Sequence, residues 1–178
     1  MKKALNLTLA ALLSLCSANV FAQKYGQVNF EEIIQLMPEM DSVNTKYQAA
    51  TQDYSEQLES IQVELNNKVY DYQKNAATMS DGVKQLKEKE IQDLRNRQQE
   101  FYQVAQQELA KVENDLMAPL VEKATEAIKK YCKANGIIAV YQTGSMIYLD
   151  ETAVPDITAK IKPELGIKPD AKLPQQQQ

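Results

Sequence analysis

Few side chains in this 178-residue sequence could take part in covalent chemistry. It contains no histidine, the usual base and metal ligand at neutral pH, so Cys132 has no imidazole to activate its thiol. The pairs Glu31-Glu32 and Asp150-Glu151 are candidates for acid–base catalysis, but they fit better as a solvated helix start and a strand end. The sequence has no Gly-rich phosphate loop and no EF-hand pattern. We therefore predict a protein that is not an enzyme and has no cofactor and no metal.

The first 22 residues have the pattern of a cleaved secretory signal peptide. Lys2 and Lys3 precede a short apolar run, Ala4 to Leu15, and Val20-Phe21-Ala22 supplies the small residue needed before a cut. We expect cleavage after Ala22 and a location outside the cytoplasm. A membrane anchor would need a longer apolar run. A lipoprotein cut before Cys16 is the less favoured alternative, because Leu15 stands where such signals have a small residue.

The mature chain is expected to be acidic. The whole sequence has a net charge of −4, and loss of Lys2 and Lys3 would make it −6. Such a surface does not attract nucleic acid, which we exclude as a partner. Cys132 would be the one cysteine left, so it would have no disulfide partner within the chain. Its apolar helical surroundings indicate a small buried hydrophobe, with a bridge between chains as the minor alternative.

Residues 38–133 predict a long helical hairpin. Their apolar residues recur at steps of three and four, as in an antiparallel coiled coil, with almost no Gly or Pro between them. The ascending seam is Met40, Val43, Tyr47, Ala50, Tyr54, Leu58, Ile61, Leu65, Val69 and Tyr72. After a turn within Asn75 to Gly82, the returning seam is Val83, Leu86, Glu90 or Ile91, Leu94, Gln98, Phe101, Ala105, Leu109, Val112, Leu116, Leu120, Ala124, Ile128 and Tyr131. About forty residues in each helix would make an arm of about 60 Å.

Two residues interrupt the returning helix. Gln98 is a polar residue in the apolar seam, and such residues can fix the register of paired helices. Pro119 removes one helical hydrogen bond, so we expect a bend there, where the helix leaves the coiled coil.

The segments that flank the arm predict a small β-rich body, so the expected fold class is α+β. Tyr25 to Phe30 alternates like a strand, and Ile137 to Gln142 with Met146 to Asp150 predicts a β-hairpin. A short helix is expected around Ile157. The predicted body comprises residues 23–37 and 134–165, and the Pro- and Gln-rich tail, residues 166–178, is predicted to be disordered.

A body of about forty residues is marginal on its own, because so short a chain buries little apolar surface. Its strands are almost continuously apolar, so both of their faces need cover. We therefore expect the body to associate with further copies of the chain. The candidate residues for this contact are Val28, Phe30, Ile137, Ile138, Val140, Ile147 and Leu149.

The arm carries two further sets of candidate contact residues. Basic residues gather near the distal turn, at Lys84, Lys87, Lys89, Arg95 and Arg97, where they could touch lipid phosphate or lipopolysaccharide. Ordinary pairing one helical turn apart, such as Lys84 with Glu88, is the favoured interpretation of this set. Off the seam, Val63, Tyr70, Met79 and Tyr102 are either singly exposed residues or weak, adaptable contacts for unfolded chains.

In this order and spacing, the features resemble the Skp/OmpH family of periplasmic chaperones for outer-membrane proteins. The resemblance is carried by Ile33-Ile34-Gln35-Leu36-Met37-Pro38-Glu39-Met40, by Leu116-Met117-Ala118-Pro119-Leu120-Val121-Glu122-Lys123 with Ala127-Ile128, and by Asn135-Gly136-Ile137. It implies a homotrimer whose strands form a shared barrel and whose three arms enclose a cavity for unfolded outer-membrane proteins. The best-known members are basic, whereas this chain is acidic. Client binding is therefore expected to depend more on apolar contacts.

Two functional hypotheses follow. The leading one is an ATP-independent periplasmic holdase chaperone, which keeps unfolded outer-membrane proteins soluble in a cavity between hairpin arms. The alternative is a structural spacer or adaptor of the cell envelope, which docks a partner through the hairpin tip. Stoichiometry separates them, because an adaptor binds one defined partner and a holdase binds many different unfolded clients.

Overall fold

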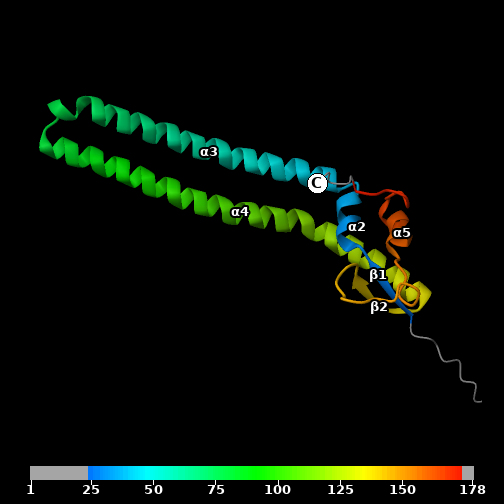
Figure 1. The fold of residues 1–178 in the computed structure, drawn as a ribbon. Helices are drawn as coiled ribbons and strands as arrows, with labels where there is room; N and C mark the ends of the chain where they lie inside the picture. Colours follow the sequence, from blue (N-terminus) through cyan, green and yellow to red (C-terminus); the bar gives the residue numbers. More distant parts are fainter. Residues whose placement is uncertain (1–23, 174–178) are drawn as a thin grey trace, which may run out of the picture.

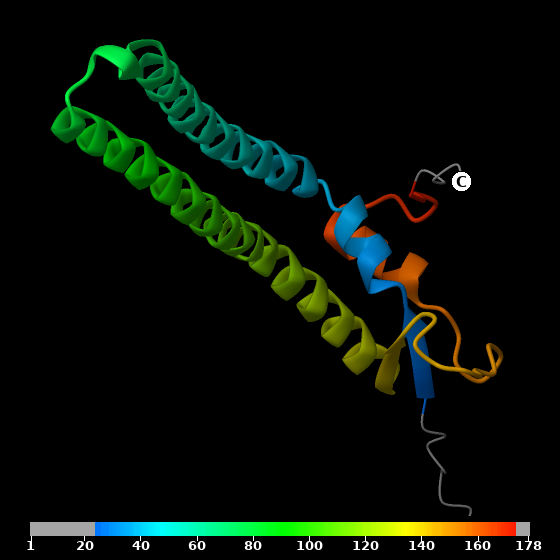
Figure 2. The same ribbon diagram turned by 60° about the vertical axis from the view of Figure 1, so that its left-hand side comes forward.

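The protein consists of a small body and a long two-helix arm that projects from it (Figures 1 and 2). The structure, a computed structural model, describes residues 24–173. The predicted signal peptide and cleavage site lie outside the described residues. The elements in chain order are β1 (Lys24–Val28), α2 (Phe30–Leu36), α3 (Met40–Asn75), the 3-10 turn η1 (Ala76–Thr78), α4 (Asp81–Asn135), β2 (Ile137–Gln142), α5 (Thr158–Ile161) and the 3-10 turn η2 (Lys162–Leu165). The predicted α+β fold class is confirmed.

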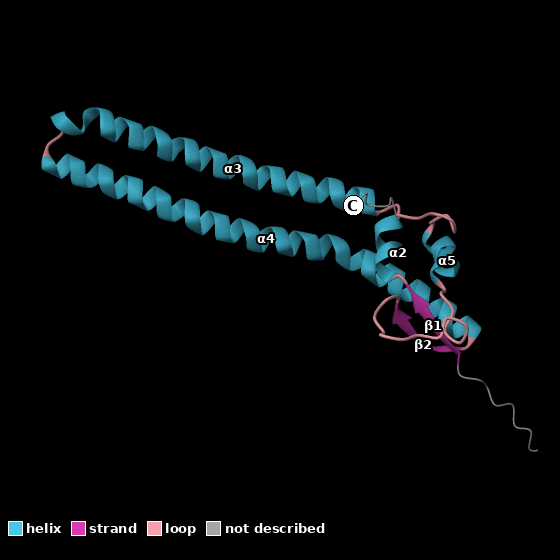
Figure 3. Ribbon diagram, viewed as in Figure 1, coloured by secondary structure: helices cyan, strands magenta, loops and turns pink. Residues whose placement is uncertain are grey.

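The arm is an antiparallel pair of helices, α3 and α4, which η1 and a short turn connect at the distal end (Figure 3). In its distal half, Ile61, Leu65, Ile91 and Leu94 are buried between the helices, as the predicted seam requires. Gln98 contributes to the register, because its Nε2 donates a hydrogen bond of 2.7 Å to Gln62 Oε1 across the pair. Most other residues of the arm are exposed, so one narrow stripe holds the two helices together.

The returning seam is wrong at its first two positions. Val83 and Leu86 are 43% and 60% exposed. Tyr72 of α3 donates a hydrogen bond to Glu88 of α4, which places Val83 and Leu86 level with Lys74 and η1. At that level the arm offers polar side chains and a turn in place of an apolar partner.

Local signals explain where the helices begin and end. The side chain of Asn29 caps α2, because its Oδ1 accepts a hydrogen bond of 3.1 Å from the backbone N–H of Glu32. Gly136 ends α4 in the left-handed conformation, with φ of 67°. Pro119 lies inside α4, which stays one helix of 55 residues and bends towards the body in its second half (Figure 1).

Strand β1 lies in the middle of the body. It pairs in parallel with β2, so that Tyr25 lies opposite Ala139 and Val28 opposite Gln142. On its other edge, the backbone N–H of Gln27 donates to Pro155 O at 3.0 Å, and Gln27 O accepts from Ile157 N at 2.9 Å. Parallel strands need a long crossover connection, and here that connection contains the entire arm.

The predicted β-hairpin is wrong. Thr143 and Gly144 form a turn after β2, but Met146–Asp150 is not a strand. Its side chains lie open to solvent, with Ile147 at 110% and Tyr148 at 82% exposure. The reason lies in the size of the body, because one chain supplies no further layer to cover both faces of a second apolar strand.

The core of the body gathers residues from almost every element. It contains Val28, Ile33, Ile34, Met37, Val43, Leu120, Ala124, Ala127, Ile157, Ile161, Leu165 and Ile167. Because Val43 comes from α3 and Leu120 from α4, this core extends into the base of the arm. Body and arm are therefore packed as one unit at their junction.

The tail differs from the expected disorder over its first residues. Gly166 turns the chain with φ of 75°, and Ile167 beyond it is 5% exposed within the core. Ala171 also packs against that core. The Pro- and Gln-rich composition of the tail predicted disorder, but Ile167 and Ala171, which follow a left-handed glycine, dock its first residues on the core. The end of the tail, from Pro174, lies outside the described residues.

Candidate functional site

Two surfaces, one on the body and one on the arm, are candidates for binding another chain. The first, named here the apolar strip, consists of Ile138, Met146, Ile147 and Tyr148, which are 58%, 45%, 110% and 82% exposed. Ile138 belongs to β2, and the other three follow the turn after it. The strip therefore adjoins the edge of β2 that carries no strand in the described part of the chain. An apolar segment beside an open strand edge is a surface suited to pairing with another chain.

The structure divides the predicted oligomerisation residues into two groups. Ile138 and Ile147 lie in the apolar strip, and Leu149 is half-buried next to it. Val28 is 4% exposed inside the core, and Phe30, Ile137 and Val140 pack against the same core. This second group stabilises the single chain. The prediction missed Met146 and Tyr148, although both belong to the same apolar run and could have been chosen from it.

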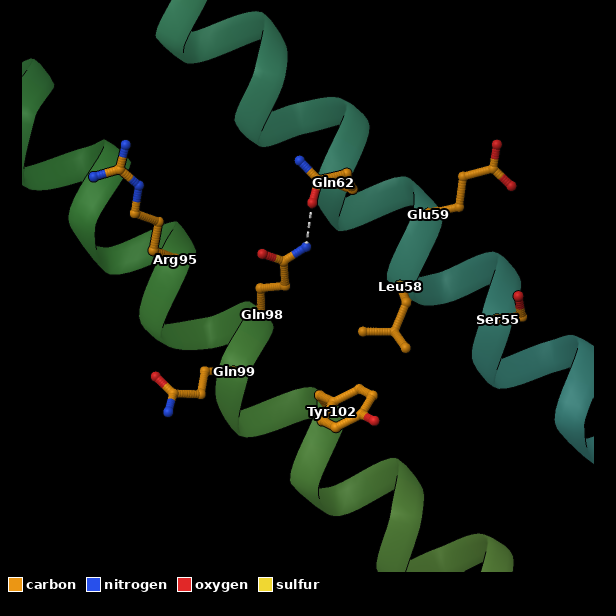
Figure 4. Close-up of a pocket in the computed structure, with 8 residues that line it drawn as sticks. All are labelled: Ser55, Leu58, Glu59, Gln62, Arg95, Gln98, Gln99 and Tyr102. Atoms are coloured by element: carbon orange, nitrogen blue, oxygen red, sulfur yellow. Dashed lines mark hydrogen bonds between the residues drawn. The ribbon is translucent and has the colours of Figure 1, made fainter.

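The second surface is an open groove on the arm, with a volume of about 660 Å³ (Figure 4). Ser55, Leu58, Glu59 and Gln62 line it from α3, and Arg95, Gln98, Gln99 and Tyr102 line it from α4. The side chains of Leu58 and Tyr102 point towards each other across the groove, and the bonded amides of Gln62 and Gln98 close one end. The groove thus combines two apolar side chains, Leu58 and Tyr102, with amide and hydroxyl groups and one charge of each sign, on Glu59 and Arg95.

The predicted client-contact residues do not form one patch. Tyr102 is 53% exposed and lines the groove. Val63 and Tyr70, at 51% and 63% exposure, are seven residues apart on α3, and neither lines the groove. Met79 is half-buried in the distal turn. The structure therefore distributes these side chains at separate places along the arm.

Part of the predicted basic tip is paired with acidic residues. Lys84 Nζ lies 3.9 Å from Asp81, where the sequence suggested Glu88 as its partner. Lys87 Nζ lies 3.2 Å from Glu90. Glu90 also accepts from Lys68 of α3 at 3.1 Å, so this cluster joins the two helices. Arg95 lines the groove, away from the turn. Lys89 and Arg97 are exposed on α4. These pairings reduce the net positive charge that the tip presents.

Two ionisable groups of the distal arm are perturbed by this pairing. Hydrogen bonds from Lys68, and next from Lys87, hold the pKa of Glu90 below its ordinary value. The hydrogen bond to the Glu88 carboxylate raises the pKa of Tyr72. The Lys68–Glu90 and Tyr72–Glu88 hydrogen bonds both join α3 to α4. The protonation states of Glu90 and Tyr72 therefore affect how the two helices are held together near the tip.

The described residues offer little for catalysis or metal binding. Residues 24–173 contain no cluster of three His, Cys, Asp or Glu side chains that could hold a metal ion. Cys132 is half-buried in α4, and burial raises the pKa of its thiol, so the reactive thiolate is disfavoured. Over the same residues, no helix combines the length and the apolar character needed to cross a bilayer.

Known proteins share both this sequence pattern and this fold. A family model described as "Outer membrane protein (OmpH-like)" matches residues 24–165. The chaperone protein Skp of Vibrio cholerae serotype O1 is 30% identical over 151 residues, which cover 83% of this chain and 89% of that protein. The crystal structure of an OmpH-like protein from Caulobacter crescentus has a TM-score of 0.67 and 13% identity, and the match covers 80% of this chain and 83% of that chain. At such low identity, the structural match shows the fold alone.

The Glu90 cluster predicts a pH-dependent distal arm. Because the pKa of Glu90 is lowered in the folded arm, its ion pairs stabilise the arm above the ordinary value of 4.5 and are lost as the pH falls through the folded value. Amide-exchange protection around Leu65 and Ile91 should then fall about two- to fivefold, as expected for solvent-exposed pairs. Glu90→Gln should remove most of this dependence, and Glu100→Gln, an exposed acid elsewhere on α4, should retain it. An unchanged pH dependence in Glu90→Gln would contradict the assignment.

Proposed function

Because the chain belongs to the OmpH-like outer membrane protein family, we propose that it is a periplasmic chaperone of the holdase type. It would bind unfolded outer-membrane proteins and keep them soluble without ATP. The observation that carries the proposal is the combination of an exposed arm with an apolar strip that one chain leaves uncovered. The Vibrio relative is named a chaperone, and a binding role agrees with the prediction that this chain is not an enzyme.

Assembly through the apolar strip is the first part of the proposal. The strip joins β-branched and aromatic side chains to the open edge of β2, and both features favour strand pairing with a second copy. Three copies would close this edge and project three arms in one general direction, with a cavity between them. A homotrimer is also what the family resemblance implies.

The second part is a weak grip at many points. Val63, Tyr70 and Tyr102 are exposed at different places along the arm, and three arms would repeat each of them three times. Unfolded outer-membrane proteins expose alternating apolar residues, which such separated tyrosine and valine side chains can contact without a fixed register. Repeated weak contacts bind a long chain through effective concentration while each contact still exchanges quickly.

Charge is expected to play a minor part in this grip. The mature chain is acidic, and Lys84 and Lys87 are engaged with acidic neighbours. Contact of the tip with a membrane surface or lipopolysaccharide would therefore be weak and would rest on Lys89, Arg95 and Arg97. The alternative, an adaptor that docks through the tip, would show one defined partner bound at fixed stoichiometry.

The trimer can be tested by light scattering during size-exclusion chromatography. The mature chain should elute with three times the mass of one chain. Ile147→Asp combined with Ile138→Asp should lower that mass to that of a monomer, since a charge within an apolar contact costs several kcal/mol. Val63→Asp, a matched change on the arm, should leave the mass unchanged. A monomeric wild-type chain would contradict the proposed assembly.

The holdase activity can be tested by diluting a denatured outer-membrane barrel protein from urea in the presence of the mature chain. Wild type in molar excess should suppress turbidity. Val63→Ser, Tyr70→Ser and Tyr102→Ser together should raise the half-effective concentration at least about fivefold, because three apolar contacts are lost from each arm. Lys89→Gln with Arg97→Gln should change it less than about twofold, and added salt should have a similarly small effect. Equal turbidity with and without wild type would refute the holdase proposal.

A further inference from the structure

The junction between body and arm has a weak point in both helices at the same level. On one side, α2 ends at Leu36 and a three-residue turn around Pro38 precedes α3. On the other side, Pro119 removes one hydrogen bond within α4. An ion pair between Glu39 and Lys123 shows that the two interruptions lie side by side. Interruptions of this kind are where paired helices bend most easily.

The chain returns to this level after the body is complete. Residues 166–173, named here the strap, leave η2 and run past the end of α2 that leads into α3 (Figures 1 and 2). A Cβ atom on Gly166 would lie 3.9 Å from Pro38 Cγ, so the strap begins beside the turn itself. The match to the family model ends at residue 165, one residue before the strap.

A buried lysine links the strap to α2. Lys162 is 3% exposed, and its ammonium group donates to Glu32 Oε1 of α2 at 2.6 Å and to Ala171 O of the strap at 2.5 Å. At the start of the strap, Ile167 is 5% exposed in the same core as Met37, which belongs to the turn before α3. A buried ammonium group is costly when a hydrogen-bond partner is lost. The hydrogen bond from Lys162 to the Ala171 carbonyl therefore favours the docked position of the strap.

The 3-10 turn η2, which immediately precedes the strap, is connected to the second helix of the arm. Glu164 of η2 forms an ion pair with Lys130 of α4. η2 thus contacts α2 through Lys162 and α4 through Glu164. The strap begins beside the turn at Gly166 and shares a core with it through Ile167. These contacts fix the turn to the body on the body side of the level at which the arm can bend.

We propose that the strap is a brace that sets the direction of the arm relative to the body. While Ile167 and Ala171 are docked, the turn at Pro38 cannot open, and α4 cannot bend further at Pro119 on its own. Release of the strap frees both interruptions and widens the range of arm directions. The device operates within one chain, so it holds whether or not the protein is a holdase or a trimer.

The experiment measures the distance between arm and body within one chain. Nitroxide labels on Glu31→Cys in α2 and Gln57→Cys in α3, both exposed positions, are placed in a Cys132→Ser background and diluted with unlabelled chain. Pulsed dipolar spectroscopy then gives the distribution of label distances. Ile167→Ser and deletion of residues 167–178 both release the strap. Lys168→Ser and deletion of residues 174–178 are the controls, because they leave the anchored residues in place.

The two release variants should broaden the distance distribution by about twofold or more, as a hinge with several accessible states requires. Both controls should keep the wild-type width. Helix content from circular dichroism should be within a few per cent of wild type in all variants, since the proposal concerns direction and leaves the helices intact. Wild-type width in both folded release variants would overturn the proposal. Loss of the body fold in both would overturn it as well, because the segment would then be part of the core and would not act as a separate brace.

Discussion

The body of this protein exposes apolar side chains that the other described elements of the chain do not cover. Within residues 24–173, strand β1 has a partner on each edge, but β2 has a partner on one edge alone, and the chain that follows it exposes Ile147 and Tyr148. The remaining body elements pack on the core side, around residues such as Ile33 and Ile161. We propose that a second copy of the chain covers this exposed apolar surface. Assembly is thus the condition on which the proposed cavity and its function depend.

The distal half of the arm, in contrast, is stabilised by contacts between its own two helices. A stripe of apolar residues, the Gln62–Gln98 hydrogen bond and the Lys68–Glu90 ion pair hold α3 and α4 together over the distal half. Most residues off that stripe are exposed and contribute little to folding, so they are available for contacts. The division matters for the proposed function, because the side chains proposed to bind clients can change without affecting the body. At the junction the two parts share one core, and there the arm's direction is set.

The sequence predicts the parts of this fold that depend on local periodicity. The arm, its turn and the role of Gln98 follow from residue spacing along one helix pair, and so does the position of Pro119 within α4. The errors concern the body, where the outcome depends on what is packed against each segment. Met146–Asp150 has the composition of a strand, yet it finds no cover in one chain, and Val28 is taken up by the core and does not reach the surface. Ile167 shows the opposite case, since one apolar residue docks a tail whose composition indicates disorder.

The central claim is that the apolar strip is covered by a second copy of the chain. Amide hydrogen exchange of the mature protein, followed by mass spectrometry, measures this directly at Met146–Leu149. If the strip is paired, these amides should exchange as slowly as those of β1, which is hydrogen-bonded on both edges within the chain. Exchange at the rate of an unstructured peptide, at concentrations where the protein suppresses client aggregation, would contradict the account.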